Sequence, residues 1–433
     1  MKISISNLDT EKRNFWKMFK NKMNVSRNVN DKTISIVKNI IKSVRKNGDK
    51  SLLRFINKYD GYKTSNLKSI RVTKKEIREA KKRISQKELT SLKQSMKRIK
   101  LFSKKQLSYS WKKEEKNTHL GEMITPIESV GVYVPGGKAS YPSTVLMNVI
   151  PAKIAGVKKI IMACPINDVK NHSLAIVAAN LCGVDEIFKM GGAHAIAALT
   201  FGTHTVPRVN KIVGPGNMFV TLAKKMVFGE VGIDNIAGPS EIVVIADNSA
   251  NPEWVAMDLF SQAEHDELAQ AILITTSKKL INSVKCSMEK IINTLPRKKI
   301  ISKSLKNRGI FIKTKTMNEA SNIANEIAPE HLEIICKNTA KIVKQIKNAG
   351  AIFLGEYSPE VFGDYCAGPN HVLPTSGSAK FSSPLGVYDF QKRSSIIKIS
   401  KQTAKELSSI ASSLAEAEGL HAHALAARLR RQK

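Results

Sequence analysis

Several kinds of residue and segment are scarce in this chain, and each scarcity excludes a class of protein. Only five cysteines occur in 433 residues, widely spaced and without a Cys-x-x-Cys pair, so a disulfide scaffold is not expected and a reducing compartment fits better. The first residues lack the apolar core of a secretory signal, and no apolar run reaches the roughly 18 residues that a membrane span needs. We therefore expect a cytoplasmic protein with no membrane partner.

Acidic residues are also few, 36 against 70 lysines and arginines, which leaves a formal net charge of +34. Such an excess on general grounds favours a polyanionic partner. Here the lysines are spread among asparagines and isoleucines over 2–116 and 278–347, and no basic block alternates with aromatic residues as single-strand-binding surfaces do. A coding bias toward lysine explains the excess, and we expect no nucleic-acid partner.

The pattern of apolar residues changes near Met123. Before it, helical spacing predicts helices over 33–59 and 73–106. After it, short β-branched runs alternate with helical stretches, which indicates parallel sheets with helices on both faces and enough strands for two of them. A break is predicted at 232–240, where glycine, proline and aspartate interrupt the pattern, and a final helix over 403–431.

Nine histidines occur in the chain, and five of them lie in four short segments of its second half. The segments are S-Q-A-E-H from 261, A-P-E-H from 328, G-D-Y-C-A-G-P-N-H from 363 and H-A-H from 421. Together they supply imidazoles, carboxylates and an amide oxygen. This set predicts one metal site and one pair of proton-transfer groups.

Two of these segments, each taken alone, fit either a functional site or an ordinary structural feature. Gln262 and His265 are three apart on a predicted helix and share a face, which also suits an ordinary polar pair at a helix end. Glu330 and His331 follow a proline at the start of an element. They are the side chains most used as general bases, yet an ordinary helix start fits equally well.

The other two segments are a glycine-rich loop and the tail. In the loop, Asp364 can supply a metal ligand and His371 a substrate contact, while the Cys366 thiol suits packing better than nucleophilic attack. In the tail, His421 and His423 are two apart and point to different helix faces, so spacing does not choose between them.

Glycine-containing turns follow three of the predicted strands, in V-P-G-G-K from 134, M-G-G-A-H from 190 and V-G-P-G-N from 213. Backbone amides at such turns can hold phosphate groups. None of them is the Gly-x-Gly-x-x-Gly fingerprint, so the signal for a dinucleotide is weak.

Taken in order, G-V-Y-V-P-G-G, G-P-G-N, A-G-P-S-E, S-Q-A-E-H, A-P-E-H-L, G-D-Y-x-x-G-x-N-H-V-L-P-T and a tail histidine resemble the L-histidinol dehydrogenase family. The resemblance runs from about residue 20 to the C-terminus. It implies a zinc- and NAD-dependent enzyme that oxidises L-histidinol through L-histidinal to L-histidine, the last step of histidine biosynthesis. Two NAD are reduced, so four electrons leave the substrate in one site.

The resemblance also implies roles for residues of this chain. The implied zinc ligands are Gln262, His265, Asp364 and His423. His331 would take the alcohol proton and Glu330 would activate water for the second oxidation. The implied substrate contacts are Ser240, Gln262, His265, His331, Asp364, His371, Glu418 and His423. NAD would contact Tyr133, Asn217 and His194, although His194 stands where the family pattern has glutamine.

The fold implied by the resemblance is α/β, with two incomplete Rossmann-like domains and helical extensions at both ends, in an intertwined homodimer. We place the N-terminal extension at 1–25 and the first Rossmann-like domain, with the metal and catalytic residues, at 26–130 and 239–380. The second domain, for NAD, would be 131–238 and the C-terminal helical tail 381–433. Glu418 and His423 would then reach the site of the partner subunit.

Two alternatives remain at this point. One is a zinc hydrolase in which Glu330 activates water and no nicotinamide takes part, consistent with the missing glycine fingerprint. The other is a nucleic-acid-binding protein driven by the net charge of +34, which predicts steeply salt-dependent binding.

Overall fold

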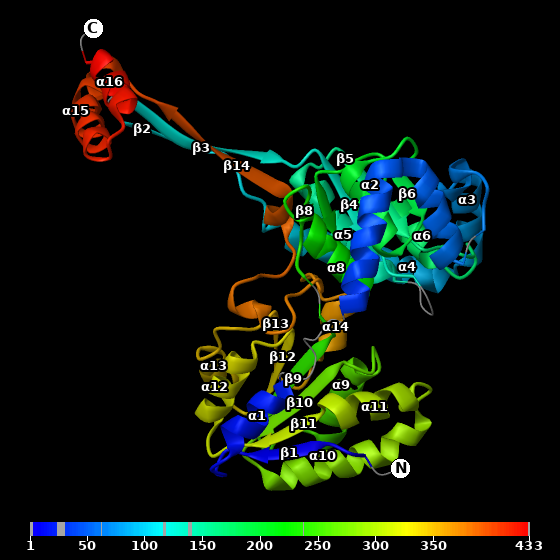
Figure 1. Cartoon of the computed structure of the whole chain (residues 1–433). Helices are drawn as coiled ribbons and strands as arrows, with labels where there is room; N and C mark the ends of the chain where they lie inside the picture. The colour runs from blue at the N-terminus through cyan, green and yellow to red at the C-terminus, as the bar shows by residue number, and fades with distance from the viewer. Residues whose placement is uncertain are drawn as a thin grey trace.

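The computed structural model describes residues 3–23, 31–61, 63–115, 118–136, 141–236 and 238–431. These residues form two α/β domains and an arm that projects away from them (Figure 1). Among these residues, no helix is both long and apolar enough to cross a membrane.

The first sheet domain is a six-stranded parallel sheet in the order β1-β11-β10-β9-β12-β13. Its strands are β1 (Ser6–Asp9), β9 (Glu241–Ala246), β10 (Gln270–Thr275), β11 (Ile310–Lys313), β12 (His331–Ile335) and β13 (Ala351–Leu354). One face is covered by α9 (Pro252–Ala263), α10 (Lys278–Ile291) and α11 (Lys298–Arg308), the other by α1 (Phe15–Met23), α12 (Met317–Ile327) and α13 (Thr339–Val343). Every residue of β9, β10 and β12 is buried, as expected for a parallel sheet covered on both faces.

The second sheet domain holds a five-stranded parallel sheet in the order β6-β5-β4-β7-β8. Its strands are β4 (Ser129–Tyr133), β5 (Lys159–Cys164), β6 (Glu186–Lys189), β7 (Lys211–Val213) and β8 (Gly232–Ile233). The helices α3 (Lys74–Arg83), α4 (Gln86–Lys104), α5 (Pro142–Ala155) and α6 (Ser173–Cys182) share one apolar core. The helices α2 (Asp31–Tyr59), α7 (Gly192–Phe201) and α8 (Met218–Val227) share the other.

Both sheets have the same strand topology. If the strands from β9 to β13 and those from β4 to β8 are each numbered from one, both sheets read 3-2-1-4-5, and β1 adds one strand at the edge of the first. In this order the chain reverses direction beside the first strand, between β9 and β12 and between β4 and β7. The two halves, which show no sequence repeat, are therefore alike in topology.

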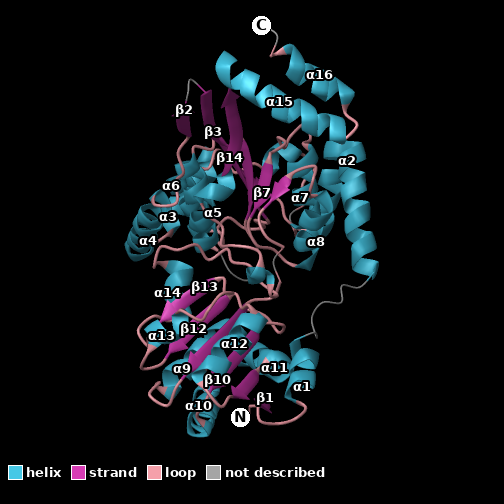
Figure 2. Cartoon of the chain, turned by 90° about the vertical axis from the view of Figure 1, so that its left-hand side faces the viewer, coloured by secondary structure: helices cyan, strands magenta, loops and turns pink. Residues whose placement is uncertain are grey.

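The arm consists of an antiparallel sheet and a pair of helices. Its elements are β2 (Trp111–Glu115), β3 (Thr118–Pro126), β14 (Gln391–Lys398), α15 (Lys401–Ala417) and α16 (His421–Leu429), with the strands in the order β14-β3-β2. Both views show it extending from the second sheet domain to a point far from the first (Figures 1 and 2). Several large apolar side chains on it are exposed, among them Ile397 at 68% and Leu414 at 61%. Exposed apolar surface of this kind is typical of interaction sites.

A short helix, α14 (Glu360–Tyr365), lies on the side of the first sheet domain that faces the second (Figure 1). Four 3-10 turns are also described, at Leu67–Ile70, Ile292–Thr294, Ser378–Lys380 and Val387–Phe390.

The predicted alternation of strands and helices is confirmed from β4 onward. The predicted helix over 33–59 is α2, but the one over 73–106 is two helices. The first helix ends before Ser85, because Ser85 caps the start of the second helix. Its hydroxyl accepts from the Glu88 amide, and the Glu88 carboxylate accepts from the Ser85 amide. The tail is likewise two helices, separated at Gly419, whose φ is 75°.

Three of the expected domain assignments differ from the structure. Residues 26–130 were expected with 239–380, yet α2, α3 and α4 pack on the second sheet domain, since their apolar faces match α6, α7 and α8 there. The extension at 1–25 is not only helical, because β1 pairs with β11. The tail at 381–433 includes β14, which pairs with β3. Of the first expectation, residues 26–30 lie outside the described residues.

Candidate active site

The candidate site lies at the amino ends of β9 and β12. Glu241 begins β9 and His331 begins β12, where His331 pairs with Ile242 of the neighbouring strand. Helix α9 packs on the sheet after β9, and its end brings Gln262 and His265 to the same region. The helix starts sharply because Asn251 caps it and Pro252 occupies its first position.

The His331 side chain is held by its Nδ1 atom, while Nε2 faces the acidic groups. Nδ1 lies 3.0 Å from the backbone carbonyl of Glu241 and donates to it, because that oxygen can only accept. Nε2 lies 3.5 Å from Asp364 Oδ1 and 3.9 Å from Glu360 Oε1, and it has no hydrogen-bond partner among the described residues. The nitrogen free to exchange a proton is therefore Nε2.

The carboxylates around His331 control its protonation. Burial opposes the charged ring, but Glu330, Glu360 and Asp364 raise the pKa of His331 well above its usual value. Burial likewise opposes ionisation of Asp364, but the positive charge of His331 beside it holds the pKa of Asp364 at about 2. His331 becomes a base only when positive charge from elsewhere offsets these carboxylates.

Glu330 is a buried carboxyl held by one backbone amide. Its Oε2 accepts from the Glu241 N–H at 2.9 Å. Burial raises the pKa of Glu330 to about 8 and that of Glu241 to about 7. A carboxyl with such a pKa exchanges protons near neutral pH, as a general base requires.

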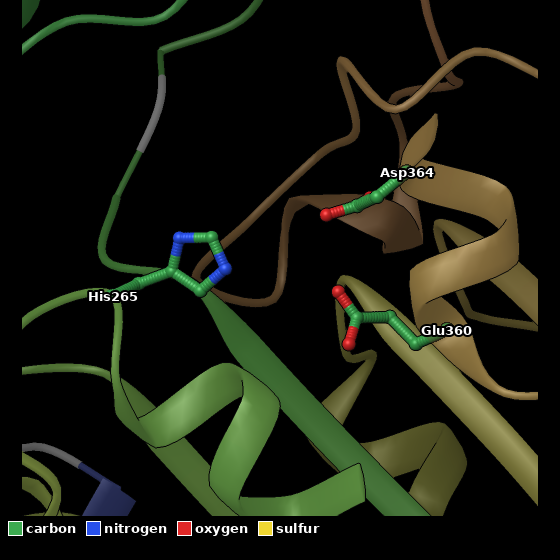
Figure 3. A group of neighbouring side chains, drawn as sticks. All are labelled: His265, Glu360 and Asp364. Carbon is green, nitrogen blue, oxygen red and sulfur yellow. The ribbon is translucent and has the colours of Figure 1, made fainter. Parts of the chain in front are cut away.

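Three described side chains have ligand atoms close enough together to hold a cation. One ligand atom each of His265, Glu360 and Asp364 lies within 4.8 Å of the others. Figure 3 shows the two carboxylates on α14 turned toward the His265 ring, which comes from the loop after α9. The group combines nitrogen and oxygen donors, which suit zinc.

The Gln262 amide is the further predicted ligand at this cluster. With its nitrogen toward Glu360 it donates to Oε1 at 3.2 Å, and its oxygen accepts from the Glu241 N–H at 3.1 Å. In the opposite orientation its oxygen faces the Glu360 carboxylate. Two acceptors at that distance repel unless a cation lies beside them. With its oxygen toward Glu360, the amide can therefore act as a metal ligand. With its nitrogen toward Glu360, it forms hydrogen bonds that close the site.

The remaining predicted substrate residues differ in position. The ring of His371 is near Asp364, with Nδ1 at 3.0 Å from the Asp364 carbonyl, and burial lowers the pKa of His371. Ser240 directly precedes Glu241, and its carbonyl accepts from the Gln270 amide at 2.9 Å. The structure therefore brings both into or beside the site.

Within one chain, the structure does not bring Glu418 or His423 to the other site residues. Glu418 ends α15 and His423 lies in α16, both exposed on the arm. Figures 1 and 2 show these helices far from α9 and α14. A site that includes them requires the arm of another chain.

The turns predicted for NAD lie where the second sheet reverses direction. Tyr133 ends β4, and Asn217 follows β7, the neighbouring strand. Open α/β sheets bind ligands beyond the carboxyl ends of the strands at this position. The two turns touch closely, since a Cβ on Gly214, whose φ is +109°, would meet the Tyr133 carbonyl oxygen at 2.1 Å. Asn217 caps α8 by accepting from the Phe219 amide at 3.1 Å.

His194 lies beneath the third turn, M-G-G-A-H. Its ring is 1% exposed, and Nε2 lies 2.9 Å from Asp60 Oδ2. The same carboxylate oxygen accepts from the Gly191 amide at 3.2 Å, while the Tyr133 hydroxyl accepts from the Gly192 amide at 3.1 Å. His194 and Tyr133 therefore support the turn from inside, with almost no surface of their own.

Sequence analysis missed two carboxylates of the site, Glu360 and Glu241. Glu241 opens the otherwise apolar run E-I-V-V-I-A, and a charged residue at a buried strand start is a signal that could have been used. Glu360 follows a proline at the start of α14, where an ordinary acidic first-turn residue gives the same pattern.

The two parallel sheets share one strand order, and the first carries a cluster of proton-transfer and metal-ligating groups. These features define the chain as an α/β protein with the residues of an enzyme active site. A family model described as histidinol dehydrogenase matches residues 23–431. The chain therefore belongs to the histidinol dehydrogenase family, a family of oxidoreductases.

Individual relatives agree with this assignment. The chain is 53% identical to a histidinol dehydrogenase of Dechloromonas aromatica over 392 residues, covering 90% of each. It is 48% identical to that of Nitrosospira multiformis over 432 residues, covering 100% of this chain and 98% of the relative. A crystal structure of histidinol dehydrogenase from Elizabethkingia anophelis superposes with a TM-score of 0.92 at 35% identity, covering 99% of this chain and 98% of that one.

Proposed function

We propose that this protein oxidises L-histidinol through L-histidinal to L-histidine, the last step of histidine biosynthesis, and reduces two NAD per turnover. The observation that supports it best is that Gln262, His265, Asp364, Glu330 and His331 converge from three separate parts of the chain. All five belong to the motifs that resemble the family, whose model matches nearly the whole chain. Membership of an oxidoreductase family favours this function over the zinc hydrolase.

Zinc fits the donor set of the cluster. Gln262, His265 and Asp364 would hold it together with His423 of a second chain, a set of oxygen and nitrogen donors. When bound, it would orient the substrate's nitrogen atoms and polarise its oxygen.

In the first oxidation, the chain must remove the proton of the substrate hydroxyl as hydride leaves its carbon for NAD. His331 is suited to take this proton at Nε2, since Nδ1 is committed to the Glu241 carbonyl. The charged groups around it keep the resulting imidazolium stable.

In the second oxidation, the aldehyde must first gain water, because hydride loss from the hydrate gives the carboxylic acid, whereas hydride loss from the free aldehyde does not. Glu330 is suited to take a proton from that water, as its pKa is raised to about 8 by burial. The backbone amide of Glu241 fixes the position of one carboxylate oxygen. The other oxygen remains for the water.

NAD would bind the second sheet domain at the turns after β4 and β7. The glycines there let backbones approach each other closely, as a phosphate-holding turn requires. Tyr133 and His194 would support these turns and Asn217 would contact the cofactor. The hydride acceptor would then face the first sheet domain, where the catalytic residues lie.

We further propose a homodimer in which each arm completes the site of the other chain with Glu418 and His423. The exposed apolar side chains on the arm support a partner, and the distance of both residues from α14 in one chain requires one. A dimer of this kind exchanges the same element in both directions.

The test is NADH formation from L-histidinol and NAD, counted per substrate consumed, before and after chelation and after zinc is restored. We expect two NADH per histidinol, lost on chelation and recovered with zinc. One NADH per histidinol with accumulating aldehyde would refute the second oxidation. Full activity in chelated, zinc-free protein would refute the role of the metal.

A further inference from the structure

The segment 366–372 connects α14 of the first sheet domain to the second sheet domain. It directly follows α14, which carries the proposed ligand Asp364, and it contains His371, the substrate contact that the resemblance implies. Val372 at its end is 7% exposed and belongs to the apolar core that α4 and α5 share. His371 therefore lies where the chain passes from one sheet domain to the other.

Helix α4 of the second sheet domain holds the beginning of this segment through backbone carbonyls. Ser95 Oγ donates to the carbonyl of Tyr365, the last residue of α14, at 2.5 Å. Arg98 Nε donates to the carbonyl of Cys366 at 2.7 Å. The end of the segment is held by a different helix, α5.

Helix α5 offers a carbonyl that its own backbone does not use. Pro151 lies inside this helix and has no N–H, so the carbonyl of Met147, four residues earlier, lacks its usual helical donor. The Asn370 side chain replaces that donor, because Nδ2 donates to the Met147 carbonyl at 2.6 Å. Its Oδ1 accepts from the Val372 N–H at 2.9 Å, which fixes the orientation of the amide. Asn370 is buried and uses both ends of its side chain.

We propose that Asn370 is a positioning residue that fixes His371 for the substrate by binding the carbonyl that Pro151 leaves open. The two adjacent residues have separate anchors. Asn370 is bonded to α5 of the second sheet domain, whereas His371 Nδ1 donates to the Asp364 carbonyl of α14 at 3.0 Å. Since Nδ1 is committed to that carbonyl, Nε2 is the nitrogen left for the substrate. The Asn370 bond sets where this ring lies between the two domains.

This role rests on the proposed function, because His371 has to meet L-histidinol. Asn370→Ala removes the donor, and Asn370→Asp keeps the shape but places a carboxylate oxygen against the Met147 carbonyl. Pro151→Ala returns a helical N–H to that carbonyl and leaves the Asn370 side chain untouched. Asn293→Ala is the matched control, an exposed asparagine outside the site.

Three quantities are measured in these variants: KM for each substrate, the midpoint of thermal unfolding, and amide hydrogen exchange of 366–372 in metal-free protein. We expect Asn370→Ala and Asn370→Asp to raise KM for L-histidinol about tenfold or more, with KM for NAD almost unchanged, because a small displacement of a substrate contact is costly. Exchange in 366–372 should become faster. Pro151→Ala and Asn293→Ala should stay within about threefold of the wild type in KM.

The double variant Asn370→Ala/Pro151→Ala separates positioning from stability. In Asn370→Ala alone, the buried Met147 carbonyl has lost its donor, which lowers the unfolding midpoint. In the double variant, the N–H introduced at position 151 satisfies that carbonyl again. We expect the unfolding midpoint to recover, while KM for L-histidinol and the exchange of 366–372 stay raised. Recovery of KM together with stability would show that Asn370 only satisfies the helix, and would overturn the proposal.

Two further outcomes are decisive. Wild-type KM for L-histidinol and wild-type exchange in folded Asn370→Ala would refute the positioning role. If the wild type does not oxidise L-histidinol at all, the proposed function is wrong, and the exchange of 366–372 then decides whether Asn370 fixes the segment. Unchanged exchange in folded Asn370→Ala would refute that as well.

Discussion

Asp60 and His194 form a buried hydrogen bond that joins the end of α2 to the turn after β6. The two side chains are 5% and 1% exposed, and their atoms Oδ2 and Nε2 lie 2.9 Å apart. The His194 ring also stacks on Tyr59 at 6.2 Å between ring centroids. The resemblance described above implies glutamine at position 194, and the bond shows that histidine is accommodated there by a carboxylate rather than by an open surface.

Asp60→Ala should weaken NAD binding more than substrate binding. It leaves the His194 ring and the Gly191 amide without their acceptor, at a cost of about 1–3 kcal/mol for each buried group. We expect the KM for NAD to rise about tenfold or more, with the KM for L-histidinol almost unchanged. His194→Gln, which restores the family pattern and can still donate to Asp60, should stay within about threefold. An unchanged KM for NAD in folded Asp60→Ala would show that the pair does not support the cofactor turn.

His265→Ala should lose bound zinc together with activity. The ring supplies one of the four proposed ligands, and the three that remain cannot complete a tetrahedral site. Metal content by mass spectrometry after dialysis is the measurement, and we expect well under a tenth of a zinc per subunit. His204→Ala is the control, an exposed histidine outside the site. Stoichiometric zinc in His265→Ala would remove His265 from the ligand set.

Glu330→Gln should stop the second oxidation and remove its pH dependence. Burial raises the pKa of Glu330 to about 8, so its base form accumulates as the pH rises toward that value and is lost below it. In the wild type, kcat/KM for L-histidinal should therefore increase with pH up to about 8 and then level off. The variant should be slower by a factor of about 10²–10⁴, the usual contribution of a general base.

The first oxidation supplies the control for Glu330→Gln. A single turnover with L-histidinol should still release the first NADH at close to the normal rate, because His331 takes that proton. Equal slowing of both oxidations would mean that Glu330 acts in binding or folding and not on water.

Two inactive variants should restore activity to each other if the arm completes the partner's site. His423→Ala damages the arm's contribution and Glu330→Gln damages the body of the site. In a mixed dimer, one of the two sites then combines an intact body with an intact arm. We expect up to about half of the wild-type activity per mixed dimer. Purified heterodimers with no recovery would show that the sites are not shared.

Sequence patterns predicted the central strands well because these strands are buried on both faces. E-I-V-V-I-A and K-I-I-M-A-C are continuous apolar runs, and both are strands as predicted. β12 was missed because it begins with the polar H-L-E of the site itself. β2 was missed because W-K-K-E-E is exposed throughout and alternates in no regular way.

The sequence could not show which sheet the N-terminal helices cover, because an amphipathic helix face can pack against any apolar surface. Val37 and Ile56 of α2 are buried against α7 and α8, a choice made only in the tertiary structure. More of the candidate site than of the helix packing was predicted from the sequence. His265 and Asp364 were both named, but Glu241 and Glu360 lie at ordinary-looking starts of a strand and a helix, and only their burial sets them apart.

The pairing of β1 with β11 also determines when β1 can fold relative to synthesis of the chain. Leu8 lies opposite Ile312, so the strand made first cannot join its sheet until some 300 residues later have left the ribosome. At about 5–20 residues per second, that interval is roughly 15–60 s. All five strands of the second sheet, β4 to β8, emerge in the meantime. The first strand of the chain is thus among the last to find its place.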